Sequence, residues 1–88
     1  MKVTKKQLED FVANEPYHMV VMYADWCGHC VDMKKRLGDK FRPYDIITFL
    51  EASDVEDELL DHFPHVHIYE NGKHRDGSLR DVYKLLNA

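Results

Sequence analysis

Residues 23–30 of this chain read Tyr-Ala-Asp-Trp-Cys-Gly-His-Cys and contain both of its cysteines. The apolar run of residues 19–23 leads into this stretch, and residues 31–37 follow it with the pattern of a helix. The two thiols, three residues apart, are therefore expected where a strand gives way to a helix. This arrangement favours dithiol–disulfide chemistry.

The size and charge of the chain exclude several classes of function. With 88 residues it can form one core, so we expect a single domain spanning residues 1–88. Its 12 basic and 16 acidic residues give a formal charge of −4, which argues against nucleic acid or an anionic membrane as a partner. No apolar run approaches the roughly 18 residues that span a bilayer, and no signal peptide is predicted. We expect a cytoplasmic monomer that binds neither nucleic acid nor membranes.

A cysteine pair in a reducing compartment is more often catalytic or metal-binding than structural. A disulfide that closes so short a loop would stabilise the fold by only about 2 kcal/mol. A zinc or cluster site needs about four ligands, and the sequence has no second cysteine pair. The histidines His62, His65, His67 and His74 could suggest a metal cluster, and strand alternation could put His65 and His67 on one face. We expect instead scattered surface or half-buried histidines, and we predict no metal site.

The hydrophobic pattern predicts the element order α-β-α-β-α-β-β-α. The expected elements are helix 5–13, strand 17–23, helix 27–38, strand 45–50, a short helix from residue 53 carrying Val55, Leu59 and Leu60, strands 65–69 and 73–76, and a last helix capped by Ser78. Capping boxes open two of the helices, Gly38 ends another, and Asn71-Gly72 marks a hairpin. The strand–helix–strand unit implies a parallel crossover, and the hairpin adds antiparallel strands. The fold class is therefore α/β, with a mixed sheet of four or fewer strands flanked by helices.

The chemistry of the pair depends on the thiolate of Cys27. At an ordinary pKa of about 8.5, only about 3% of this thiol is ionised at pH 7. At the first turn of a helix, unpaired N–H groups and the helix dipole stabilise the anion, and His29 can add a positive charge. Cys30 lies one turn further on, where it can attack a mixed disulfide formed on Cys27. Gly28 leaves the approach to the sulfur open.

Residues 26–30, Trp-Cys-Gly-His-Cys, preceded by Met22-Tyr23-Ala24, resemble the active site of the thioredoxin superfamily, in the form found in the catalytic domains of protein disulfide isomerases. Residues 63–73 resemble the family segment that carries a cis-proline before an antiparallel hairpin. The likeness covers about residues 18–86. It implies a thioredoxin-like fold in which Pro64 is cis and faces the cysteines, while Phe63 and Trp26 line the substrate groove.

The sequence also departs from that family. It lacks room for the first strand of a typical thioredoxin, so its outline is similar to that of a glutaredoxin, although glutaredoxins usually carry Cys-Pro-Tyr-Cys. Val21 stands where the family places the buried acid thought to accept the proton of the second thiol. Asp25 and Glu51 are weak candidates for that task. Phe63 is bulkier than the usual residue before the proline.

The interpretation is a thiol–disulfide oxidoreductase in which Cys27 attacks, Cys30 resolves and His29 tunes the thiolate. It needs no cofactor beyond its own disulfide, acts on proteins that carry disulfides or dithiols, and draws electrons from a reductase or from glutathione. A small protein reductase is favoured, and the Cys-Gly-His-Cys motif keeps an oxidase or isomerase open. A module that binds a metal or cluster through Cys27 and Cys30, or a redox-inert adaptor, is the alternative from another class.

Overall fold

The computed structural model describes residues 2–59 and 61–88. Its regular elements are α1 (Lys5–Val12), β1 (Tyr17–Tyr23), α2 (Gly28–Leu37), β2 (Ile47–Glu51), β3 (His65–Glu70), β4 (Lys73–Gly77) and α3 (Leu79–Leu86). The strand predicted over residues 17–23 and the helix predicted over 27–38 are confirmed within one residue at each end. The strand predicted from residue 45 begins two residues later, at Ile47.

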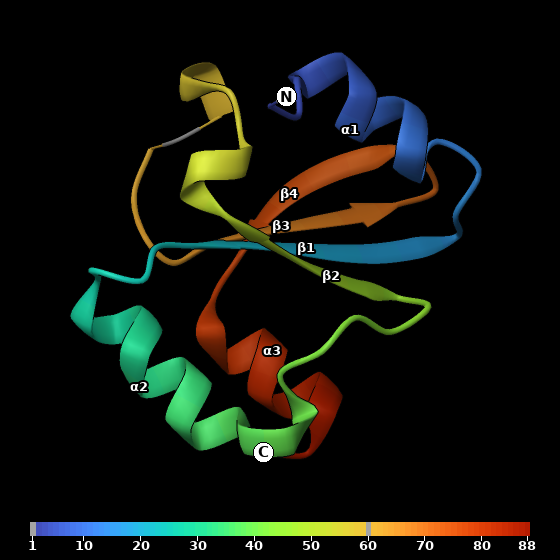
Figure 1. Cartoon of the computed structure of the whole chain (residues 1–88). Coiled ribbons are helices and arrows are strands. Elements are labelled where there is room, and N and C mark those ends of the chain that lie inside the picture. Colours follow the sequence, from blue (N-terminus) through green and yellow to red (C-terminus); the bar gives the residue numbers. More distant parts are fainter. Residues whose placement is uncertain (1, 60) are drawn as a thin grey trace.

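The four strands form one mixed sheet in the order β2-β1-β3-β4 (Figure 1). β1 pairs with β2 in parallel, and with β3 antiparallel, so β1 has partners on both sides. Five consecutive residues of β1, 18–22, are buried, because helices cover both faces of the sheet, and this explains its nearly continuous apolar sequence (Figure 1). The closing hairpin turns at Asn71 and Gly72, whose positive φ angles of 52° and 81° are those of a tight two-residue turn.

Helices cover both faces of the sheet, α1 on one side and α2 with α3 on the other (Figure 1). Side chains of alternating strand residues therefore build two cores. The core under α2 and α3 contains Met19, Val21, Met33, Leu37, Ile47, Val66, Ile68 and Val82. The core under α1 contains Leu8, Val12, Val20, Met22, Val55, Leu59 and Tyr69. Val66 and Ile68 of β3 thus face α2 and α3, whereas Tyr69 of the same strand faces α1.

Local capping explains where the helices begin and end. Thr4 and Gln7 form the predicted capping box of α1, and Ser78 forms one with Asp81 at α3. Gly38 ends α2 with a φ of 53°, a conformation that costs glycine little. None of the helices described has the length and apolar character needed to cross a membrane.

The prediction of a short helix from residue 53 is wrong. Two 3₁₀ turns, Ala52–Asp54 and Asp57–Leu59, stand in its place, while Leu60 lies outside the described residues. Val55 between them is extended and forms a parallel bridge with Val3, whose N–H donates to the Asp54 carbonyl at 2.8 Å. This backbone pairing competes with a helix and prevails. The bridge to Val3 is a single-residue pairing, in the part of the chain where the sequence left no room for a first strand.

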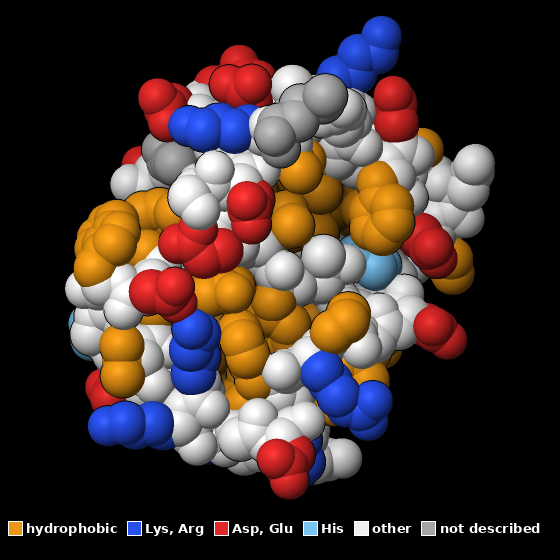
Figure 2. All heavy atoms as spheres, in the orientation of Figure 1, with side chains coloured by type: hydrophobic (Ala, Val, Ile, Leu, Met, Phe, Trp, Pro, Cys, Tyr) orange, Lys and Arg blue, Asp and Glu red, His pale blue; other side chains and the backbone are white. Residues whose placement is uncertain are grey.

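The edge strand β2 leaves apolar side chains accessible between the helices. Figure 2, in the same orientation as Figure 1, shows hydrophobic patches above and below the course of β2, one toward α1 and one toward α2. On the α1 side, the side chains of Val3, Leu8, Phe11 and Leu50 line a shallow depression. Nothing in the fold of the described residues covers it.

Gly77 ends β4 in close contact with β3. A Cβ at this position would lie 2.7 Å from Cδ1 of Ile68 and 3.0 Å from Cγ1 of Val66. Both neighbours are buried, and the same Cβ would lie 3.0 Å from the Asp81 carboxylate that caps α3. The position therefore requires glycine for space.

We predict that Gly77→Ala lowers the free energy of unfolding by about 1–3 kcal/mol, the usual cost of overpacking a core. Gly28→Ala is the matched control, because a Cβ there meets nothing within 4 Å. Urea denaturation of both variants makes the comparison. Equal midpoints for Gly77→Ala and the unmodified protein would contradict the packing account.

Candidate active site

The two cysteines lie at the start of α2, with unequal access to solvent. Cys27 is the N-cap residue, in an extended conformation, and its side chain is partly exposed. Its own N–H donates to the Ala24 carbonyl at 3.1 Å, which closes the turn between β1 and α2. Cys30 lies within the first turn and is buried, and both residues are free thiols in this structure.

The environment of Cys27 favours its thiolate. The backbone N–H of Cys30 is the largest cause that lowers the pKa of Cys27, and the thiol of Cys30 and the N–H of His29 act in the same direction. Partial burial opposes them and is outweighed. The unpaired N–H groups of a helix start therefore stabilise the anion, as the sequence predicted.

The environment of Cys30 favours its protonated form. Burial is the main cause that raises the pKa of Cys30 to about 11, and its hydrogen bond to Cys27 adds to the effect. The N–H of Ala24, 3.4 Å from the sulfur, partly offsets this. Cys27 thus ionises first, and Cys30 keeps its proton until the site changes.

The predicted cis-proline is present, and it brings β3 to the cysteines. The Phe63–Pro64 peptide bond is cis, and the Cys27 thiol donates to the Phe63 carbonyl across 3.6 Å. Trp26 is 76% exposed and meets the Phe63 ring edge to face, with centroids 5.4 Å apart. An exposed aromatic surface therefore lies beside the accessible sulfur, and Gly28 leaves space around it.

The side chain of His29 is exposed on the first turn of α2. Its backbone N–H, rather than its imidazole, is what contributes to the lowered pKa of Cys27. Tuning of the thiolate by the imidazole stays a prediction.

Val21 is fully buried in the core under α2 and α3. An apolar side chain therefore occupies the position at which related sequences carry a buried acid. Of the two substitute acids, Glu51 accepts a hydrogen bond from the N–H of Ser53 at 2.7 Å, and Asp25 pairs with Lys34 at 2.5 Å. Lys34 also acts on the sulfur: its positive charge lowers the pKa of Cys30, although less than burial raises it. Sequence reasoning missed Lys34. The signal was its spacing, four residues after Cys30 on the same helix.

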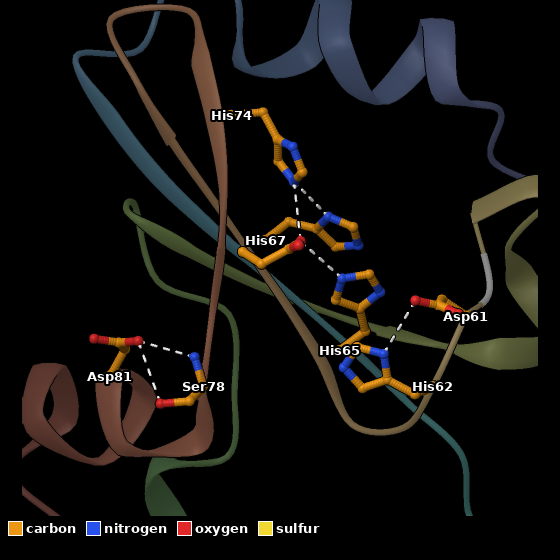
Figure 3. A network of polar contacts seen from close by, with 8 residues as sticks. Asp61, His62, His65, His67, His74, Ser78 and Asp81 are labelled. Atoms are coloured by element: carbon orange, nitrogen blue, oxygen red, sulfur yellow. Dashed lines mark hydrogen bonds and ion pairs between the residues drawn. The ribbon is translucent and has the colours of Figure 1, made fainter.

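The expectation that the four histidines are scattered is wrong. His62, His65, His67 and His74 follow one another in a row (Figure 3), with ring centroids of successive pairs 4.5, 3.9 and 5.0 Å apart. Burial, together with the neighbouring His65 and His74, lowers the pKa of His67 to about 4. Strand alternation puts His65 and His67 of β3 on one face, and the hairpin register places His67 opposite Asp76 and diagonal to His74 of β4.

Comparisons with known proteins agree with this geometry. The Thioredoxin family model matches residues 1–84. The fold is similar to a thioredoxin pre-protein of Schistosoma mansoni (TM-score 0.60, 19% identity, covering 99% of this chain and 92% of that one) and to thioredoxin f2 of Chlamydomonas reinhardtii (0.60, 20%, 99% and 93%). It is also similar to the first thioredoxin domain of mouse protein disulfide-isomerase A4 (0.58, 16%, 97% and 71%). No curated protein sequence gives a significant match.

The chain belongs to the thioredoxin family, because the family model covers nearly all of it. With its two neighbouring free cysteines, it is a thiol–disulfide oxidoreductase, and proteins of the thioredoxin family act on disulfide-containing protein substrates. At these identities the solved structures establish the fold alone.

We predict that the two thiols react with iodoacetamide over different pH ranges. The rate at Cys27 should rise through a pKa below the ordinary value of about 8.5, because helix N–H groups stabilise its thiolate. The rate at Cys30 should stay low until the pH approaches about 11. Mass spectrometry of peptides after short pulses separates the two sites. Equal labelling at pH 7 would contradict the asymmetry.

Proposed function

We propose that this protein is a small protein-disulfide reductase. The observation that carries the proposal is the asymmetry of the pair, an accessible sulfur poised as a thiolate in front of a buried, protonated one. The exposed ring of Trp26 and the Phe63 backbone flank the reactive sulfur and offer an extended substrate a surface beside it. Glutathione or a separate reductase would restore the dithiol.

The reaction follows from the two thiols. The Cys27 thiolate attacks one sulfur of the substrate disulfide, which forms a mixed disulfide and releases the other sulfur as a thiolate. Cys30 then loses its proton and attacks the sulfur of Cys27. The second substrate sulfur leaves as a thiolate, and a disulfide bond now joins Cys27 and Cys30. The protein has been oxidised and the substrate disulfide reduced. Two electrons have passed to the substrate, whose two thiolates take up protons.

An oxidase or isomerase remains the second candidate. Interactions that lower the pKa of Cys27 stabilise the dithiol form and shift the couple toward oxidant. The reference potentials are about −270 mV for thioredoxin and about −180 mV for protein disulfide isomerase. A potential nearer the first value supports the reductase, and one nearer the second supports the oxidase or isomerase.

We further propose that Lys34 and Asp25 replace the missing buried acid. Lys34 lies one turn after Cys30, and its charge favours the Cys30 thiolate. Asp25 holds the ammonium group at 2.5 Å, and this contact is the main cause that raises the pKa of Lys34. Lys34 therefore stays cationic, and the exposed Asp25 carboxylate beside it can take the proton through water.

Substitution of each cysteine tests the two-step mechanism. Cys27→Ser should reduce insulin at less than about 1% of the normal rate, because no nucleophile remains. Cys30→Ser should stop at a stable mixed disulfide, visible as a covalent adduct on a non-reducing gel. Dithiothreitol supplies electrons in the insulin assay, whereas the mixed disulfide is formed with protein that was reduced beforehand and freed of dithiothreitol. If the unmodified protein reduced insulin no faster than Cys27→Ser does, the chain would be an adaptor rather than a reductase.

Substitution of Lys34 tests whether its charge assists the deprotonation of Cys30. With the aromatic disulfide DTNB, the first release of thionitrobenzoate reports attack by Cys27 and the second reports resolution by Cys30. Lys34→Gln should slow the second release about two- to fivefold, the size of an exposed charge effect, and move its pH profile upward. Lys35→Gln removes an equal charge from the neighbouring exposed position and serves as the control. Equal second-phase rates in the two variants would exclude the role.

A further inference from the structure

The β3–β4 hairpin gathers three imidazoles and a carboxylate on one face of the sheet. His65 and His67 are two residues apart on β3, and His74 and Asp76 are two apart on β4, so each pair points to the same side. The register sets His67 directly opposite Asp76, and His74 opposite Tyr69. Two rigid, paired strands therefore hold all four groups.

The potential ligand atoms lie close together. Nε2 of His65 is 3.0 Å from Oδ1 of Asp76, and Nδ1 of His67 is 2.8 Å from Nε2 of His74. Nε2 of His74 is 3.8 Å from that same Asp76 oxygen. Ligand atoms of a tetrahedral zinc ion are about 3.3 Å apart, from bond lengths near 2.0 Å. His65, His67 and Asp76 each offer an atom within 4.8 Å of the other two, and His74 lies beside two of the three.

The hydrogen bonds within the protein do not satisfy this cluster. His65 and His67 are each more than nine-tenths buried, yet Nδ1 of His65 and Nε2 of His67 have no hydrogen-bond partner. These are the ring nitrogens opposite the proposed ligand atoms, so a metal bound at Nε2 of His65 and Nδ1 of His67 would not pair them. Within the protein, the two buried imidazoles have only their contacts in the cluster to offset the cost of burial.

A negatively charged opening leads to the cluster. His65, His67 and His74 line a pocket of about 300 Å³ between β3, α1 and the second 3₁₀ turn. The carboxylates of Glu9, Glu58 and Asp61 lie on its rim, against the single cation of Lys5. This charge balance favours entry of a cation over an anion.

We propose that His65, His67 and Asp76, with His74 as the fourth ligand, form a binding site for a divalent transition-metal ion of the zinc type. Imidazole and carboxylate together suit zinc and its neighbours, whereas magnesium and calcium prefer ligand sets made of oxygen. The site is separate from the thiols. No group of three potential ligand residues that includes Cys27 or Cys30 comes together among the described residues.

The position of the site gives it a route to the catalytic surface. His65 directly follows Pro64, and the carbonyl of Phe63 contacts the sulfur of Cys27. A metal bound to both β3 and β4 would fix the start of β3, and with it the cis-proline segment beside the reactive thiol. Metal occupancy would thereby stabilise the fold and hold the groove in one arrangement.

The first experiment asks whether binding needs the thiols. Zinc is titrated by calorimetry into the full chain carrying Cys27→Ser and Cys30→Ser, with circular dichroism as a check of its fold. We expect one ion per chain, no competition from magnesium, and a rise in the unfolding temperature with zinc. In the unmodified protein, zinc should leave the alkylation rate of each thiol unchanged. Loss of binding in the thiol-free chain, together with zinc protection of the thiols from alkylation, would assign the metal to the cysteines and overturn the proposal.

The second experiment tests the ligand set with exposed residues, whose substitution should not unfold the protein. Asp76→Asn and His74→Asn should each weaken zinc binding by more than about 100-fold, the upper range for loss of an outer-shell partner. His62→Asn is the matched control, because His62 stacks on His65 but makes its polar contact with Asp61. Unchanged affinity in both ligand variants, or an equal loss in the control, would show that the four groups form only a hydrogen-bonded cluster.

Discussion

This site depends on the hydrogen bonds between the Cys27 sulfur and the backbone N–H groups at the start of α2. A helix leaves its first N–H groups without partners, and an anion placed there is stabilised by hydrogen bonds and by the dipole. One turn deeper, the same helix carries Cys30 into the core, where burial raises the pKa of its thiol. A single secondary-structure element thus makes one thiol a nucleophile and keeps the other in reserve.

The sheet topology places this helix end in its working position. Because β1 lies between β2 and β3, the chain leaving β1 at Tyr23 emerges next to the segment that enters β3. The Phe63 carbonyl can therefore contact Cys27, although 36 residues separate the two. The hairpin that completes the sheet also brings the histidines of β3 next to His74 of β4. Strand β3 thus serves both sites, through its pairing with β1 at the thiols and its pairing with β4 at the proposed metal site.

Much of this arrangement can be predicted from the sequence, because it rests on local signals. The apolar run of β1, the Asn71-Gly72 turn and the capping residues each encode their element directly. The segment around Val55 was mispredicted, because its structure depends on long-range pairing with Val3. The Lys34–Asp25 pair and the histidine row depend on contacts across elements. The histidine row did carry a signal: counting back from the two-residue turn sets His67 opposite Asp76.

The central claim is that Cys27 and Cys30 act as one two-electron couple, and equilibration with glutathione tests it most directly. Protein is incubated over a range of ratios of reduced to oxidised glutathione, quenched with acid and analysed by intact mass. The account predicts one transition between the dithiol and an internal disulfide, with a slope of about 30 mV per tenfold change in the equilibrium constant. Accumulation of glutathione adducts on two independently titrating thiols, without an internal disulfide, would contradict it.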